Sequence, residues 1–283
     1  MPTSPEELTM DMNITAGATV GELVAVWLEK LRTRGRLENT TINEYERVLR
    51  KVVIPELGDC GLRELTTNRM DCFLDALRGL GVNRQRKAKV VTGAMLEIAV
   101  KLGVITSNPV RGTASVVRPK TEARALTLDE IDTARAAVRT WMAMDRPGPK
   151  ATHDMADLID VMLGTGARIG EVLALRWSDI DLDATRLSVS GTIKTETGKG
   201  TYRKPLCATR TVALPQFVVA VLRRRQGSAR RSATYAVFPT RNGTWQQVNN
   251  VERRWRRIRQ EAGLEWVTPH AFRKNAGNIH REA

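Results

Sequence analysis

The chain has 283 residues, of which 42% are hydrophobic, so it can bury a sizeable core, and this length favours two domains. Lys and Arg number 45 against 31 Asp and Glu, a net charge of +14 that favours a polyanionic partner such as nucleic acid over a merely solvated basic surface. No apolar run reaches the ~18 residues of a membrane span, and the N-terminus is acidic where a signal peptide is basic. The three cysteines have no metal-ligand spacing, so we expect free thiols in a reducing cytoplasm and no metal site.

The first residues, 1–16, are expected to form a flexible tail, and residues 17–113 a helical domain. Thr19 and Glu22 form a capping box that begins a first helix, which extends to Leu31. A second helix is expected from Thr40 or Thr41 towards Pro55, and a third from Thr66 to the glycines at 79 and 81. A fourth helix, with Asn83 as its cap, is expected to bury an apolar side made of Val90, Val91, Met95, Ile98, Ala99 and Leu102.

Four basic residues crowd the start of this fourth helix: Arg84, Arg86, Lys87 and Lys89. Cations at a helix N-terminus oppose the helix dipole unless an anion is bound there. DNA phosphates would supply that anion, and we therefore expect these four residues to contact DNA. A solvated helix end is the alternative for each of them.

Residues 114–125 form an expected basic linker, followed by a second domain, 126–283, in which most of the positive charge lies. A capping box at Thr127 and Glu130 begins its first helix, and further helices are expected at 153–164, 169–175, 216–226 and 246–262. Residues 187–193 and 209–214 alternate as strands, with a hydrophilic hairpin tip at 194–208 between them. The fold class expected is therefore mainly α with a small antiparallel β-sheet. The glycines at 164–170 have neither Walker nor Rossmann spacing, so no cofactor is expected.

Two motifs in the second domain resemble sequence patterns of a known protein family. Residues 165–181 read TGARIGEVLALRWSDID, which resembles the first box of the tyrosine recombinase (phage integrase) family, T-G-x-R-x-G/S-E-x-x-x-L-x-W-x-D-I-D. Residues 268–273, TPHAFR, look like the H-x-x-R box of the same family. The resemblance covers nearly the whole chain. It implies a helical, SAM-like core-binding domain at 17–113 and a tyrosine-recombinase catalytic domain at 126–283.

The resemblance implies that Arg168 and Arg273 bind the scissile phosphate and that His270 assists proton transfer. Glu171, three residues after Arg168, is expected on the same helical face, where it can orient Arg168. Two arginines suit this role, because the negative charge that develops on the phosphate oxygens can be stabilised by forked hydrogen bonds from two guanidiniums. Surface arginines and a histidine satisfied by backbone are the alternative readings. The resemblance requires neither a metal nor another cofactor, since the arginines replace a metal as charge stabilisers.

The family also has a lysine on the hairpin that acts as general acid. Aligning the Arg-Thr-Val ends of the two patterns puts Lys204 at this position, although the intervening residues match poorly. Lys194 and Lys199 lie on the same hairpin and are alternatives to it. We expect Lys194, Lys199 and Arg203 to contact DNA.

The family's nucleophilic tyrosine follows the H-x-x-R box, whereas Tyr45, Tyr202 and Tyr235 all precede it, so no nucleophile is expected in this chain. Residues 274–278 also depart from the family pattern by placing Asn and Gly where a buried helix is expected, which indicates decay, a frameshift or a truncated gene. We therefore expect the catalytic domain to be C-terminally incomplete.

These features predict a cytoplasmic site-specific DNA recombinase or integrase of a mobile element. In complete form it would bind an attachment-type duplex as a homo-oligomer, a tetramer, and rejoin strands through a 3′-phosphotyrosyl intermediate. A catalytically inactive DNA-binding pseudo-recombinase or a gene fragment is the alternative.

Overall fold

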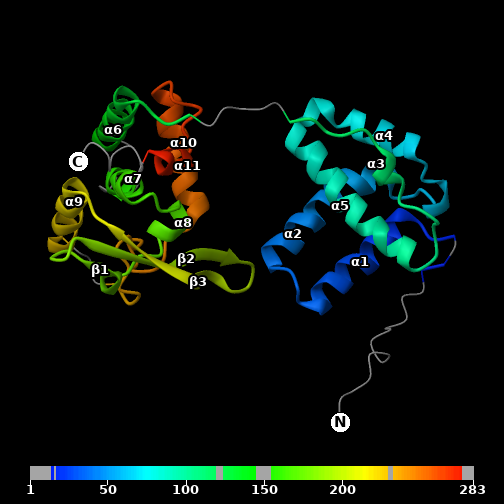
Figure 1. Cartoon of the computed structure of the whole chain (residues 1–283), viewed down its shortest axis with the longest axis horizontal. Helices are drawn as coiled ribbons and strands as arrows, with labels where there is room; N and C mark the ends of the chain where they lie inside the picture. Colours follow the sequence, from blue (N-terminus) through cyan, green and yellow to red (C-terminus); the bar gives the residue numbers. More distant parts are fainter. Residues whose placement is uncertain (1–13, 16, 119–123, 145–153, 229–231, 276–283) are drawn as a thin grey trace, which may run out of the picture. The chain divides into compact units, whose positions relative to one another are not determined.

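The computed structural model describes residues 14–15, 17–118, 124–144, 154–228 and 232–275 (Figure 1). It divides into two compact units, Met1–Thr121 and Glu122–Ala283. The division falls inside the linker expected at 114–125. Within the described ranges, no helix is both long and apolar enough to cross a membrane.

The first unit is entirely helical around one apolar core. Its core includes Trp27, Leu49, Phe73 and Met95. The π-helical turn Leu49–Val53 and Pro55, which lies in the first turn of the next helix, let the chain stay helical to Leu57. The α-helices are α1 (Val20–Arg34), α2 (Asn39–Val48), α3 (Ile54–Leu57), α4 (Thr67–Ala76) and α5 (Val82–Lys101), with short 3₁₀ turns at Leu62–Glu64, Arg78–Leu80 and Pro109–Gly112.

The helix starts of the first unit show which local signals are reliable. The Thr19–Glu22 capping box is present, because the N–H of Glu22 donates to Thr19 Oγ1 (3.3 Å) and the N–H of Thr19 donates to Glu22 Oε2 (2.8 Å). Thr66 caps α4 through the N–H of Arg69 (3.2 Å). The expectation for Asn83 is wrong, because Gly81 (φ 99°) turns the chain and α5 already begins at Val82.

The buried face of α5 also differs from the expectation. Val90 is 61% exposed and Leu102 is 40% exposed. The buried stripe contains Ala88, Val91 and Met95, and Val90 lies about 100° around the helix from Val91. Leu102 is the C-cap of the helix, and it is not part of the buried stripe.

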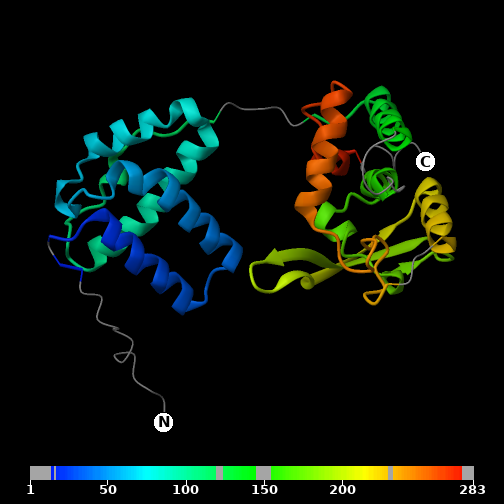
Figure 2. The same ribbon diagram turned by 180° about the vertical axis from the view of Figure 1, so that it is seen from behind.

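The second unit packs helices against a small sheet, which confirms the expected fold class (Figures 1 and 2). The sheet is antiparallel in the order β1-β2-β3. Trp255 and Phe272 lie in the core with their ring centroids 5.2 Å apart. The helices are α6 (Leu128–Ala143), α7 (Asp154–Thr165), α8 (Ile169–Val172), α9 (Gln216–Gly227), α10 (Val248–Glu261) and α11 (Pro269–Lys274), and the strands are β1 (Ile180–Asp181), β2 (Arg186–Glu196) and β3 (Gly200–Ala213).

The hairpin is longer than the sequence pattern predicted. Residues 194–208 are mostly strand rather than tip, and only 197–199 lie between β2 and β3. The outer part of this hairpin is made almost entirely of polar side chains, so no alternation of apolar residues marks it as strand, and its sequence resembled a loop. The register shifts between Val189 and Gly191, where residues 206–209 of β3 lie opposite Ser190 alone.

Candidate functional site

The first box lies where α7 ends and α8 begins. Gly166 adopts a left-handed conformation (φ 61°), and Thr165 supports the turn by donating its hydroxyl to Val161 O (2.5 Å) and accepting the N–H of Ala167 (3.2 Å). This break places Arg168 at the N-cap of α8, with its side chain 63% exposed. The Thr-Gly pair of the motif thus presents the guanidinium at the surface of the unit.

Glu171 lies beneath Arg168 and is buried, with 3% of its side chain exposed. Its Oε1 accepts a hydrogen bond from Arg168 Nη1 (2.9 Å), and its Oε2 accepts from the backbone N–H of Arg168 (2.9 Å). Arg210 Nη2 of β3 also donates to Oε2 (2.6 Å). Burial alone would raise the pKa of this carboxyl, but the hydrogen bonds from Arg210 and Arg168 outweigh it and lower the pKa below its usual value. These hydrogen bonds hold the carboxylate of Glu171 against both Arg168 and Arg210.

Gly170 of the same box lets α8 approach the sheet closely. A Cβ at this position would lie 2.9 Å from Thr192 Oγ1 of β2. The absence of a side chain at position 170 thus leaves room for Thr192 of the hairpin.

The second box forms α11, which Pro269 begins at its first position. Ala271 and Phe272 face the core, His270 is exposed, and Arg273 is half-buried. Arg273 Nη1 is buried and has no hydrogen-bond partner among the described residues. A buried guanidinium nitrogen without an acceptor is costly, so this donor is suited to an anion from outside the chain.

The two boxes lie on neighbouring elements. Helix α11 packs against α7, the helix that leads into Arg168 (Figure 1). Ala167 and Ala271, each adjacent in sequence to a predicted catalytic residue, belong to the same core cluster.

Asn275, one of the residues at 274–278 that depart from the family pattern, makes defined contacts in the fold. Its side chain is buried and makes two hydrogen bonds to the backbone of Leu126, donating from Nδ2 to Leu126 O (2.6 Å) and accepting the N–H of Leu126 at Oδ1 (2.8 Å). An asparagine therefore fits this buried position, where it links α11 to the start of the second unit. Residues 276–278 lie outside the described part of the chain.

The hairpin lysines occupy different positions. Lys204 is half-buried on β3, paired with Thr192, and the irregular residues 206–209 separate it from Arg210. Lys194 is paired with Tyr202 across the ribbon, and Lys199 lies in the turn with its Nζ 4.1 Å from the centre of the Tyr202 ring.

Arg203 is not placed to contact DNA. Its side chain is only 10% exposed; its Nε donates to Ala174 O (2.9 Å) and its Nη2 to Ser190 Oγ (2.6 Å). The missing side chain of Gly191 makes room for it, because a Cβ there would lie 2.5 Å from Arg203 Cζ. We therefore reassign Arg203 to joining the hairpin to the segment after α8.

The basic residues of α5 fall into two groups. Arg84 and Arg86 are exposed. Lys87 forms an ion pair with Glu44 (2.5 Å), and Lys89 donates to the carbonyl oxygens of Thr113 (3.1 Å) and Ala114 (2.8 Å). A phosphate would therefore compete with protein acceptors for both lysines.

A basic face on α10 was not singled out from the sequence. Arg253, Arg256 and Arg257 are exposed along one side of this helix, while Trp255 and Ile258 are buried on the other. The signal was available in the helical spacing of these arginines, but the overall basic composition of the chain concealed it.

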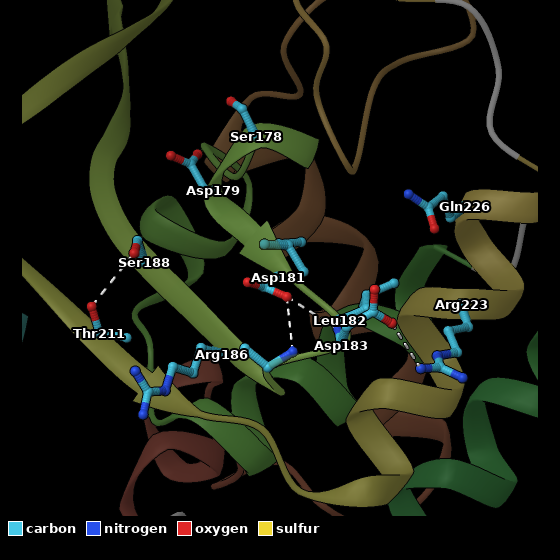
Figure 3. Close-up of a pocket in the computed structure, with 12 residues that line it drawn as sticks. Ser178, Asp179, Asp181, Leu182, Asp183, Arg186, Ser188, Thr211, Arg223 and Gln226 are labelled. Atoms are coloured by element: carbon cyan, nitrogen blue, oxygen red, sulfur yellow. Dashed lines mark hydrogen bonds and ion pairs between the residues drawn. The ribbon is translucent and has the colours of Figure 1, made fainter.

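The sheet edge holds an open pocket of about 840 Å³, and its lining includes none of the predicted catalytic residues (Figure 3). Its charged groups largely satisfy one another. Asp181 Oδ1 accepts the N–H groups of Asp183 and Ala184, and Arg223 pairs with Asp183 (3.5 Å). No group of three or more potential metal-ligating side chains occurs in the described ranges.

Two family models and several characterised proteins are similar to this chain. Residues 122–280 match the model of the phage integrase family, and residues 19–77 match that of the phage integrase N-terminal SAM-like domain. The chain is 26% identical to a tyrosine recombinase XerC-like protein of Caldanaerobacter subterraneus subsp. tengcongensis, over 90% of this chain and 70% of the relative. It is 27% identical to the tyrosine recombinase XerC of Xylella fastidiosa, over 69% of this chain and 60% of the relative.

Two solved structures share the fold. The Tn1549 transposon integrase in complex with circular intermediate DNA matches with a TM-score of 0.75 and 21% identity, over 93% of this chain and 87% of that one. A lambda integrase tetramer bound to a Holliday junction matches with a TM-score of 0.71 and 18% identity, over 100% of this chain and 79% of that one. Because the family model matches more than half of the chain, this protein belongs to the phage integrase family.

Proposed function

We propose that the chain binds duplex DNA as a site-specific recombinase of the tyrosine type, which cuts and rejoins strands only in a complete form, and that its second unit holds a phosphodiester between Arg168 and Arg273. The observation that carries this proposal is the buried Nη1 of Arg273, a donor without a partner among the described residues, on a helix packed against the one that leads into Arg168. Two guanidiniums held in this way can bind the same phosphate in forked geometry.

The chemistry assigned to the site is a transesterification. In a complete form, a tyrosine phenolate that is none of the chain's three tyrosines would attack phosphorus, the bond from phosphorus to the 5′ oxygen would break, and the leaving oxygen would take a proton. The arginines stabilise the charge on the non-bridging oxygens, and His270, one turn before Arg273, assists in positioning and proton transfer. Lys204 is our proposed general acid, since β3 carries it beside the first box.

None of the chain's three tyrosines is assigned the role of nucleophile. Tyr45 stacks on Trp27 in the first unit, with ring centroids 5.8 Å apart. The hydroxyl of Tyr202 donates to Glu196 (2.5 Å), and Tyr235 is 73% exposed on a loop before the second box. These placements support the alternative that the 283 residues by themselves bind DNA without cutting it.

The proposed partner is an attachment-type duplex. The proposed phosphate contacts are Arg84, Arg86, Lys87, Lys89, Lys194 and Lys199, together with Arg253, Arg256 and Arg257 of α10. Assembly as a tetramer on DNA is proposed by analogy with the lambda integrase structure, which is a tetramer bound to a Holliday junction. Action on cellular or phage DNA implies a cytoplasmic location.

The test combines a selection with an adduct assay. Duplexes bound by the chain are selected from a random library, and we expect one motif to be enriched, with an affinity that falls steeply as salt rises. A nicked substrate carrying that motif should give no covalent adduct. Arg168→Gln and Arg273→Gln should weaken binding more than Arg223→Gln, a matched loss of charge at the sheet edge.

Binding without any enriched motif would overturn the site-specific function. An adduct trapped on Tyr202 or Tyr235 would overturn our assignment of the tyrosines.

A further inference from the structure

Arg210 is a second cation on the carboxylate that holds Arg168. It comes from β3, where it is paired with Val189, and its Nη2 reaches Glu171 Oε2 at 2.6 Å. Arg210 lies outside both boxes, and its Arg-Thr-Val segment served above only to align Lys204. Glu171 is thus bound by one arginine from its own box and by one from the hairpin.

The two arginines differ in their relation to solvent. The side chain of Arg168 is 63% exposed, whereas that of Arg210 is 39% exposed and the carboxylate between them is 3% exposed. A buried carboxylate is stable as an anion only when it is paired, and water screens an exposed partner more strongly. Arg210 is therefore the better shielded of the two charges that keep Glu171 ionised.

We propose that Arg210 is a positioning residue for Arg168 that acts through Glu171. This inference rests on the proposed phosphate site and extends it to the hairpin. With Arg210 in place, Glu171 holds both the backbone N–H and Nη1 of Arg168, and the remaining guanidinium nitrogens of Arg168 are oriented for a phosphate. Because Lys204 lies on the same strand beyond the irregular residues 206–209, Arg210 also ties the strand of the proposed general acid to α8.

The experiment measures two properties of the full chain by NMR. The first is the pKa of Glu171, from its side-chain carboxyl ¹³C signal, assigned by its loss in Glu171→Gln. The second is the affinity of inorganic phosphate, from the Nε–H signal of Arg168. We expect Arg210→Gln to raise the pKa of Glu171 by about one unit or more and to weaken phosphate binding by about tenfold at acidic pH, but less at neutral pH.

Three variants make the result specific. Arg210→Lys should restore most of both properties, because it keeps a cation near the carboxylate. In a Glu171→Gln background, Arg210→Gln should cause no further loss of phosphate affinity, as required if Arg210 acts only through Glu171. Arg223→Gln removes an equal charge elsewhere and should change neither property.

The inference would be overturned if a folded Arg210→Gln variant kept the Glu171 pKa and the pH dependence of phosphate binding of the unsubstituted chain. It would also be overturned if the losses of phosphate affinity from Arg210→Gln and Glu171→Gln were additive in the double variant. If the unsubstituted chain gave no phosphate-dependent shift at Arg168, the proposed function would fail instead. The pKa of Glu171 would still report on Arg210 in that case.

Discussion

The buried hydrogen bonds of Asn275 allow a quantitative test of the second unit. Asn275→Ala removes both bonds to Leu126 and leaves a buried N–H and a buried C=O unsatisfied. Each orphaned group costs roughly 1–3 kcal/mol, so we expect a loss of about 3 kcal/mol in the free energy of unfolding. For a unit of this size that corresponds to a fall of about 6–12 °C in Tm.

The assay is urea unfolding followed by tryptophan fluorescence, with Asn249→Ala on the exposed side of α10 as the matched control. The control should change the free energy of unfolding by less than about 0.5 kcal/mol. If Asn275→Ala were equally mild, Asn275 would not join α11 to the start of the unit.

Three further predictions concern charge and packing. Hydrogen bonds from Arg47 and Lys87 lower the pKa of Glu44 to about 2. The free energy of unfolding of the unsubstituted chain should therefore approach that of Glu44→Gln as the pH falls from 4.5 towards 2, and urea unfolding at several pH values would measure this. Arg256→Gln should reduce the slope of log affinity for duplex DNA against log salt by about 0.9; an unchanged slope would remove α10 from the interface. Gly164→Ala should destabilise the chain by about 1–3 kcal/mol in thermal unfolding, because the added Cβ would lie 2.3 Å from Val218 Cγ2, and an unchanged Tm would contradict this packing.

The structure shows which features could be predicted from sequence and why. The capping boxes at Thr19 and Thr127 were predictable because each depends on residues three apart in the chain. The length of the hairpin was not predictable, because a solvated ribbon has no apolar alternation to mark it. The burial of Val90 was mispredicted because it lies next in sequence to Val91 but on another side of the helix.

The candidate site was predictable where the chemistry lies in a local motif. Arg168 and Glu171 are three residues apart, and their contact follows from helical spacing. Arg210 and Asn275 make their contacts with residues distant in sequence, so no local pattern could reveal them. Arg203 looked like any basic residue on a polar hairpin, and only the space beside Gly191 shows that it points inward.

The central claim is that Arg168, His270 and Arg273 act on a single phosphate. A crystal structure of the chain bound to its selected duplex tests this most directly. We expect one phosphate within hydrogen-bond distance of both guanidiniums, with His270 beside it and Glu171 still bound to Arg168. Two arginines bound to different phosphates, or turned away from the DNA, would contradict it.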